Sequence, residues 1–196
     1  MGLREQNAAR TRRHIAAAAM REFGDRGYDA TTMEDVARGA DIGLSTLYRY
    51  FPTKEQLATA YLGDPGLMGE ELRARPVDEP TEVALGQVLL GFIDQVTSTP
   101  EEGRIFGGVM EESSRVRARL LEWLGDAHVA LSDALTDREG LPAGDVGAAA
   151  EAWVAILVLQ QATLGSDVDD PTRARDEVVA VMRDLSTRTL RTPRAE

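Results

Sequence analysis

One stretch of the sequence constrains the fold more than any other, and it runs from Thr31 to Lys54. It reads T-T-M-E-D-V-A-R-G-A-D-I-G-L-S-T-L-Y-R-Y-F-P-T-K. Thr31 and, more weakly, Thr32 stand three residues before an acidic residue, which predicts a helix start of the capping-box type. The sequence G-A-D-I-G marks a tight turn, and Pro52 ends the second helix because the residue before a proline is disfavoured in the α region. The stretch therefore predicts two short helices joined by a turn.

The second of these helices carries an unusual set of side chains. Within residues 44–50, Leu47 and Tyr50 are expected to face inward, so the helix has little apolar surface to hold it. Four side chains share the expected outer face, namely Ser45, Thr46, Tyr48 and Arg49. Small hydroxyl residues let a helix approach a DNA groove closely, and tyrosine and arginine can reach phosphates or base edges. The pattern is typical of a helix-turn-helix that binds duplex DNA, although two short helices could also simply pack into a larger bundle.

Residues around these two helices suit contact with DNA phosphates. Thr31 and Thr32 would place the N-terminus of the first helix, with its free N–H groups, beside a phosphate. Lys54 begins the next helix, where the helix dipole disfavours a cation unless an anion lies nearby. The first 13 residues contain four arginines, among them Arg12, against one glutamate, which predicts a basic segment for phosphate contact.

The charge of the chain is distributed unevenly. The net charge is −11, yet residues 1–62 carry nine Arg or Lys against eight Asp or Glu, whereas residues 63–196 carry 13 against 25. A near-neutral head with a basic segment suits phosphate contact, and an acidic remainder discourages DNA from lying across the wrong face. A solvated surface would account equally well for the same charges.

The rest of the chain is also predicted to be helical, without the alternation of a strand. Apolar residues recur at helical spacing over residues 12–27, 54–62, 67–75, 81–99, 115–138, 145–165 and 171–190, and Pro100 opens a further helix. The sequence Gly-Asp-Pro-Gly at residues 63–66 interrupts the fourth helix. The helix over residues 145–165 is apolar nearly all round, which predicts burial on more than one side.

The composition argues against an enzyme. With no cysteine and two histidines, a thiolate or histidine-rich metal site is disfavoured, and G-x-S-x-G, P-loop and H-E-x-x-H sequences are absent. We therefore assign no catalytic residue, no metal and no cofactor. No apolar run approaches the roughly 20 residues of a membrane helix, and no secretory signal is seen, so a soluble cytoplasmic protein without a membrane partner is expected.

Residues 15–62 resemble the DNA-binding head of the TetR family of bacterial transcriptional regulators. The similarity rests on F-G-D-R-G-Y-D-A-T-T at 23–32, D-V-A at 35–37, T-L-Y-R-Y-F at 46–51, and on Ala40 and Lys54. The resemblance implies an all-α fold of about nine helices, with a three-helix DNA-binding head and a C-terminal helical bundle. It implies a DNA-binding domain at 1–62, with the helix-turn-helix at 31–51, and a dimerisation and effector domain at 63–196.

The resemblance also implies partners and a function. We expect a ligand-responsive homodimeric repressor of transcription that binds a palindromic operator in double-stranded DNA and an unidentified small-molecule effector. The homodimer would form through the helices near 145–165 and 171–190. The alternative is a regulator without a small-molecule effector, controlled by a protein partner or acting as an activator. The expected DNA-binding residues are Arg12, Thr31, Thr32, Ser45, Thr46, Tyr48, Arg49 and Lys54.

At the turn, Asp41-Ile42-Gly43 stands where the family usually has Gly-Val-Ser, so the second helix of the motif lacks a serine cap. In the larger domain, a pocket between helices is the natural effector site. Its candidate lining residues are Leu89, Phe92, Phe106, Met110, Trp123, Leu124, His128, Trp153 and Gln160. Most apolar residues at such positions are ordinary core, and His128 is more typical of a hydrogen-bonded helix residue than of a ligand contact.

Overall fold

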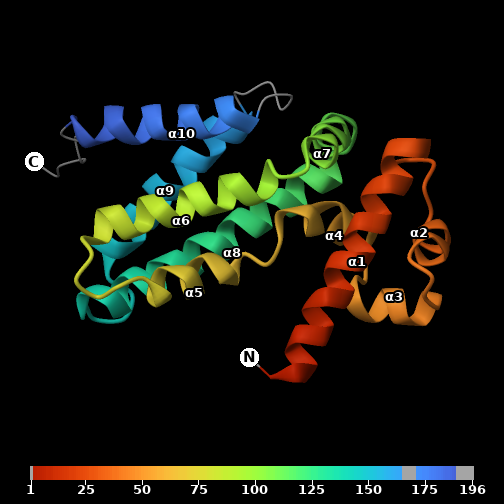
Figure 1. Ribbon diagram of the computed structural model, residues 1–196, viewed down its shortest axis with the longest axis horizontal. Helices are drawn as coiled ribbons and strands as arrows, with labels where there is room; N and C mark the ends of the chain where they lie inside the picture. The colour runs from red at the N-terminus through yellow and green to blue at the C-terminus, as the bar shows by residue number, and fades with distance from the viewer. Residues whose placement is uncertain (1, 165–170, 189–196) are drawn as a thin grey trace, which may run out of the picture. The chain divides into compact units, whose positions relative to one another are not determined.

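The computed structural model describes residues 2–164 and 171–188, and within these residues it contains helices and no strand. The all-α prediction is therefore confirmed for the described chain (Figure 1). The helices are α1 (Leu3–Arg26), α2 (Met33–Gly39), α3 (Leu44–Tyr50), α4 (Lys54–Thr59), the 3-10 turn η1 (Ala60–Leu62), α5 (Gly66–Ala74), α6 (Thr81–Val96), α7 (Pro100–Glu112), α8 (Ser114–Glu139), α9 (Val146–Leu164) and α10 (Pro171–Ser186).

The chain forms two compact units. The head unit comprises Met1–Pro65 and Thr99–Asp126, and the body unit comprises Gly66–Ser98 and Ala127–Glu196. Helix α8 begins in the head unit and ends in the body unit. The head unit thus takes in α7 and the first half of α8, which lie beyond the division at residue 62 expected from the sequence. That division remains a proposal about function.

The head unit is built around α1, against which α2, α4, η1 and α7 all pack (Figure 1). Its core is continuous and apolar, and fully buried members from four of its helices are Ile15, Val36, Leu47 and Val116. Helix α7 approaches α1 so closely that a Cβ atom on Gly24 would lie 2.7 Å from Cδ1 of Ile105. Burial of these side chains, worth about 1.5–3 kcal/mol for each large one, holds the short α2 and α3 in place.

Helix α1 begins at Leu3, nine residues earlier than the apolar periodicity predicts. Residues before Ile15 are partly or fully exposed where their side chains are described, so no apolar face marks this part of the helix. Its alanines, arginines and glutamine are strong helix formers, and they extend a helix whose nucleus already exists in the packed part of α1. Periodicity detects packing, and therefore it misses an unpacked extension.

The predicted break in the fourth helix is confirmed. Helix α4 passes into η1, and Gly63 then adopts φ = 82°, a left-handed conformation that favours glycine. The chain resumes as α5 after Pro65. The described residues therefore hold ten α-helices and one 3-10 turn, since the break divides one expected helix into two.

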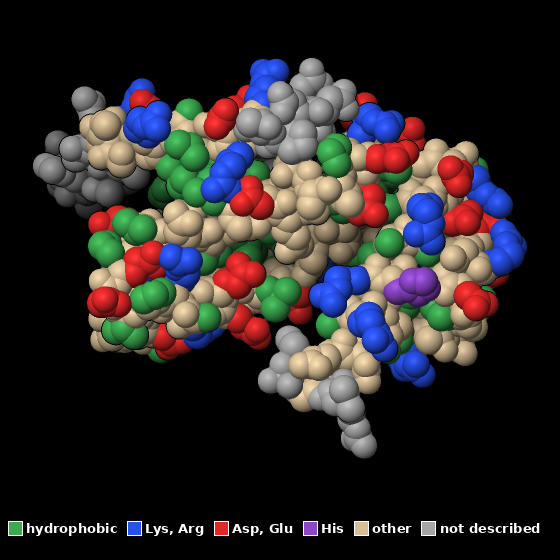
Figure 2. Space-filling view, in the orientation of Figure 1, with side chains coloured by type: hydrophobic (Ala, Val, Ile, Leu, Met, Phe, Trp, Pro, Cys, Tyr) green, Lys and Arg blue, Asp and Glu red, His purple; other side chains and the backbone are tan. Residues whose placement is uncertain are grey.

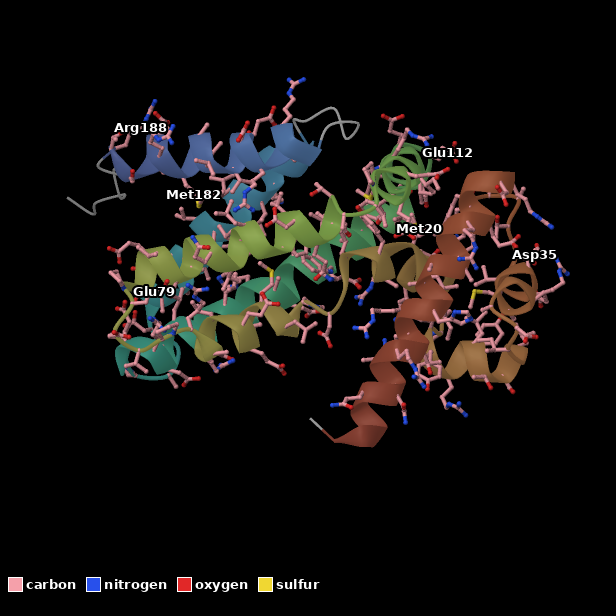
Figure 3. The ribbon with its side chains drawn as sticks, viewed as in Figure 1. Met20, Asp35, Glu79, Glu112, Met182 and Arg188 are labelled. Carbon is pink, nitrogen blue, oxygen red and sulfur yellow. The ribbon has the colours of Figure 1, made fainter. Side chains whose placement is uncertain are left out.

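The body unit packs α6 against α5, α9 and α10, and α10 also lies along α9. Helices α5 and α8 cross very closely, because a Cβ atom on Gly69 would lie 2.4 Å from the carbonyl oxygen of Ala130. Arg138 closes the α5–α6 loop by donating hydrogen bonds of 2.6 Å to the carbonyl oxygens of Pro76 and Glu79, of which Figure 3 labels Glu79. No helix of the described chain has the length and apolar character needed to cross a lipid bilayer.

Candidate nucleic-acid interface

The start of α2 is fixed by a reciprocal cap between Thr32 and Asp35 (Figure 3 labels Asp35). The Asp35 N–H donates to Thr32 Oγ1 at 3.1 Å, and the Thr32 N–H donates to Asp35 Oδ2 at 3.0 Å. The Thr32 hydroxyl also donates to Asp35, at 2.7 Å. These hydrogen bonds from Thr32, helped by Arg38 and Arg26, hold the pKa of Asp35 at about 2. Thr32, the weaker of the two caps predicted from the sequence, is therefore the residue that caps α2.

Thr31 lies inside the head unit, although the sequence predicted that it lies beside a DNA phosphate. It is 2% exposed, and its hydroxyl donates to the carbonyl oxygens of Gly27 and Glu22 at 2.8 and 3.0 Å. Its N–H donates to the carbonyl oxygen of Tyr28. Thr31 therefore joins α1 to the start of α2, and its side chain is not presented to a phosphate. Thr32, which is exposed, remains a candidate.

The turn between α2 and α3 is held from outside the motif. The carbonyl oxygen of Ala40 accepts a 3.0 Å hydrogen bond from Nε2 of His14 on α1. Asp41 then adopts φ = 52°, the left-handed conformation that a short polar side chain tolerates better than most. Gly43 precedes α3 without a side-chain cap, as the sequence predicts.

Helix α3 presents a polar outer face. Leu47 is fully buried and anchors the helix, whereas Ser45, Tyr48 and Arg49 are exposed and Thr46 is partly exposed. Tyr48 keeps 45% of its surface accessible, which is unusual for a large aromatic residue within a described helix of this unit. The structure therefore brings together the four side chains that the sequence placed on one face. Hydroxyl, phenol and guanidinium groups on a short, firmly anchored helix can donate to phosphates and to base edges in a major groove.

Lys54 lies at the first position of α4 and is partly buried. Its ammonium lies 4.2 Å from the centroid of the Tyr28 ring and 3.4 Å from the carbonyl oxygen of Asp29. Burial lowers the pKa of Lys54, and the nearby carboxylates of Asp29 and Glu55 act in the opposite direction. The cation is thus held at one place beside the motif by an aromatic face.

Arg12 connects α1 with the end of α3. Its guanidinium carbon lies 5.3 Å from the centroid of the Phe51 ring and 5.9 Å from that of Tyr50. Arg49 approaches the same Tyr50 ring at 5.5 Å, so this ring has a guanidinium group from each of two helices beside it. In Figure 2, Lys and Arg side chains lie at several places on the visible face of the head unit, with Asp and Glu side chains among them. Tyr50 and His14 contribute to this arrangement through contacts between distant positions, which no local sequence signal reveals.

The candidate effector-pocket residues do not fall within one unit. Phe106, Met110, Trp123 and Leu124 belong to the head unit, whereas Leu89, Phe92, His128, Trp153 and Gln160 belong to the body unit. Phe106 packs against Tyr61 with 5.6 Å between ring centroids, and it lies with Met110 against the head core. His128 Nε2 makes a 3.0 Å hydrogen bond with the carbonyl oxygen of Ala149, so His128 is a hydrogen-bonded helix residue, as the sequence favoured.

One face of α9 is apolar and exposed. The His128 ring stacks on Trp153 at 4.2 Å, yet Trp153 itself is 53% exposed, and Leu157, one helical turn further, is 45% exposed. Val146 lies on the same face at the start of the helix. Other apolar side chains of α9, such as Ile156 and Leu159, are buried, and the helix packs against α6 and α10. The helix therefore carries more apolar surface than one chain covers.

No group of three or more His, Asp or Glu side chains is placed to hold a metal ion within the part of the chain that the structure describes.

Comparison with known proteins supports the geometry of the head. Residues 15–61 match the model of the family described as bacterial regulatory proteins, tetR family. This match covers α1 from its first core residue through α2, α3 and α4, and it thus includes the whole candidate interface except the first residues of α1.

Relatives extend the similarity beyond the head. The HTH-type transcriptional regulator TcmR of Streptomyces glaucescens is 27% identical over 128 residues, which cover 63% of this chain and 56% of TcmR. The chain thus spans little more than half of that relative. The biofilm operon icaADBC HTH-type negative transcriptional regulator IcaR of Staphylococcus aureus (strain Newman) is 24% identical over 130 residues, covering 56% of this chain and 67% of IcaR.

A solved structure shares the fold across most of the chain. The transcriptional regulator FadR from Bacillus subtilis, solved in complex with stearoyl-CoA, superposes with a TM-score of 0.60. The alignment covers 88% of this chain and 96% of FadR at 16% identity. At this identity the likeness concerns the fold alone.

Proposed function

Because this chain belongs to the TetR family of bacterial transcriptional regulators, we propose that it is a sequence-specific repressor that binds operator DNA as a homodimer. Each head places α3 in the major groove of one half-site of a palindrome, with the half-sites about one helical turn apart. A small molecule bound by the larger domain, residues 63–196, favours a state whose heads do not fit the operator. The protein acts in the cytoplasm, where the bacterial chromosome lies.

The observation that carries this proposal is the outer face of α3. Leu47 is fully buried beneath the helix, so the exposed Tyr48 and Arg49 are carried on a rigid support. Lys54 and Thr32 flank this face and supply phosphate contacts that fix the register of the protein on the duplex. A repressive rather than activating role is supported by the relative IcaR, which is named a negative regulator.

The apolar face of α9 supports the homodimer. Trp153 and Leu157 are large apolar side chains left exposed by the single chain, and a second copy of the same face would cover them. Helix α10 packs along α9 and is the second helix of the proposed interface. Two copies of one face related by a twofold axis would also match a palindromic operator.

The proposed effector is an apolar or amphipathic small molecule. The fold relative FadR was solved with stearoyl-CoA, a thioester with a long acyl chain. The body-unit candidates Leu89, Phe92 and Gln160 combine buried apolar surface with a partly buried amide, which is the composition typical of such sites. A thermal-shift panel that includes acyl-CoA thioesters tests this point, since an effector must raise the unfolding midpoint and release operator DNA. If no compound does so while operator binding is intact, the regulator without an effector is the better account.

Selection from random DNA tests the main proposal. Immobilised full-length protein is incubated with a pool of random duplexes, and bound DNA is amplified and sequenced over several rounds. We expect enrichment of a palindrome with half-sites about one turn apart or slightly more. Enrichment of a single asymmetric site would contradict the homodimer, and the absence of any enriched sequence would contradict the assignment as a sequence-specific DNA-binding protein.

A further inference from the structure

The first three turns of α1, residues 3–13, extend beyond the packed part of the head. Ile15 is the first fully buried residue of the helix, and no described side chain before it is buried. At a rise of about 1.5 Å per residue these 11 residues add roughly 16 Å to α1. We call residues 3–13 the N-terminal extension.

The arginines of this extension differ from most arginines elsewhere in the described chain. Arg10, Arg12 and Arg13 make no ion pair with a described carboxylate. Among the described side chains of the extension, the only hydrogen bond between two side chains is the long one from Arg10 to Asn7, at 3.4 Å. In contrast, arginines in both units pair with acids, for example Arg73 with Asp137 at 2.7 Å. Three unpaired cations within four residues repel one another, so the arrangement favours an external anion.

The three arginines lie on one half of the helix surface, which we call the basic face. At 100° per residue, Arg12 and Arg10 lie 160° apart around the helix, and Arg13 lies between them. The Arg12 edge of this face is fixed against the end of α3, where its guanidinium lies over the rings of Phe51 and Tyr50. The basic face therefore begins beside α3 and continues outward along the extension.

We propose that the N-terminal extension is a second DNA-binding element, which contacts the phosphate backbone outside the half-site that α3 occupies. This inference rests on the proposed function, because it requires α3 to bring the head onto DNA. The positive charge of the extension favours DNA phosphates as its binding partner. Because the extension is helical before binding, its backbone loses less conformational entropy when the contact forms. The contact adds affinity and salt dependence without sequence discrimination.

The test compares Arg10→Gln/Arg13→Gln with wild type on the selected operator. Glutamine is nearly as good a helix former as arginine, so the helix is retained, and circular dichroism verifies this. We expect the slope of log affinity against log salt concentration to fall by about 0.9 for each phosphate that the variant no longer neutralises. Ethylation interference should show that wild type binds phosphates outside the half-site and that the variant does not. Discrimination between operator and random DNA should remain unchanged.

Two further variants separate the possible results. Arg10→Lys/Arg13→Lys retains both charges and should restore the wild-type slope. Arg21→Gln/Arg104→Gln removes the same charge from exposed positions on α1 and α7. Arg21 is about 16 Å along α1 from Arg10, and α7 meets α1 at Gly24, about 21 Å from Arg10, so this variant should keep the wild-type slope. If wild type selects an operator, but Arg10→Gln/Arg13→Gln keeps the wild-type salt slope and the phosphate contacts outside the half-site, this inference is wrong and the proposed function stands. A wild type that selects no operator would overturn the proposed function, and this inference with it.

Discussion

The indole Nε1 of Trp123 donates a 2.9 Å hydrogen bond to the carbonyl oxygen of Gly63, the residue at which the fourth helix breaks. Both residues belong to the head unit, and Trp123 is buried on α8. The break leaves backbone groups without helical partners, and this bond satisfies one of them. Trp123 thus ties α8 to the end of η1, which gives it a structural role in addition to the pocket role proposed from the sequence.

Replacing Trp123 with phenylalanine tests how much this hydrogen bond contributes to the stability of the protein. The variant Trp123→Phe retains an aromatic ring and removes the donor, so the Gly63 carbonyl is left without it. We expect a decrease of about 1–2 kcal/mol in the free energy of unfolding, including the effect of the smaller apolar volume. Urea denaturation measures it, with Tyr48→Phe as a control at an exposed ring. Equal midpoints for Trp123→Phe and wild type would show that the bond contributes nothing.

The cap of α2 predicts a dependence of stability on pH. Hydrogen bonds from Thr32 lower the pKa of Asp35 from 3.8 to about 2 in the folded protein. Because the pKa of Asp35 is lower in the folded than in the unfolded protein, ionised Asp35 stabilises the fold fully above pH 3.8, and this stabilisation is lost as the pH falls through about 2. Wild type and Asp35→Asn are unfolded with urea at a series of pH values from 6 downward. The difference between their free energies of unfolding should narrow below about pH 4. A difference that stays constant over this range would contradict the cap.

The left-handed turn residue predicts a graded series at one position. Asp41 has φ = 52°, which valine adopts only with strain and glycine adopts freely. We expect Asp41→Val to destabilise the protein by about 1–2 kcal/mol and Asp41→Asn to be nearly neutral. Asp41→Gly should not destabilise it, because relief of strain offsets the larger entropy of the unfolded chain. Urea denaturation ranks the three, and a valine variant as stable as wild type would refute the conformational argument.

The apolar face of α9 predicts the effect of charge on self-association. Trp153→Glu and Leu157→Glu place a carboxylate where the proposed partner packs, and burying it unpaired is strongly unfavourable. We expect sedimentation equilibrium to show a dimer for wild type and a monomer for both variants, with unchanged helix content. Val77→Glu is the control, since this 93% exposed residue lies in the loop between α5 and α6. Dimers that survive both α9 substitutions would place the interface elsewhere.

Local signals were enough to predict the motif itself. The position of α3 follows from the turn glycine and from Pro52, and its outer face follows from helical periodicity around Leu47. Helix boundaries elsewhere agree within a few residues wherever a packed apolar stripe or a proline marks them. These features depend on neighbours along the chain, and therefore a single sequence contains them.

Features that depend on distant contacts were not predictable in the same way. Thr31 and Thr32 are alike locally, and only the carbonyl oxygens of Glu22 and Gly27 determine that Thr31 is the buried one. The unpacked start of α1 lacks the periodicity that reveals packed helices. The candidate pocket residues share an apolar character but divide between two units, because hydrophobicity predicts burial without telling which core a side chain joins.

The most direct test of the central claim is the operator preference of recognition-helix variants. Tyr48→Ala, Arg49→Ala and, as a control on α1, Arg21→Ala are titrated against the selected operator and against random duplex in gel-shift assays at one fixed salt concentration. If α3 reads the operator, Tyr48→Ala and Arg49→Ala should reduce the ratio between operator and random-DNA affinity by about tenfold or more, since a good base contact is worth about 1–3 kcal/mol. Arg21→Ala should keep the wild-type ratio. A wild-type ratio in both α3 variants would contradict the account.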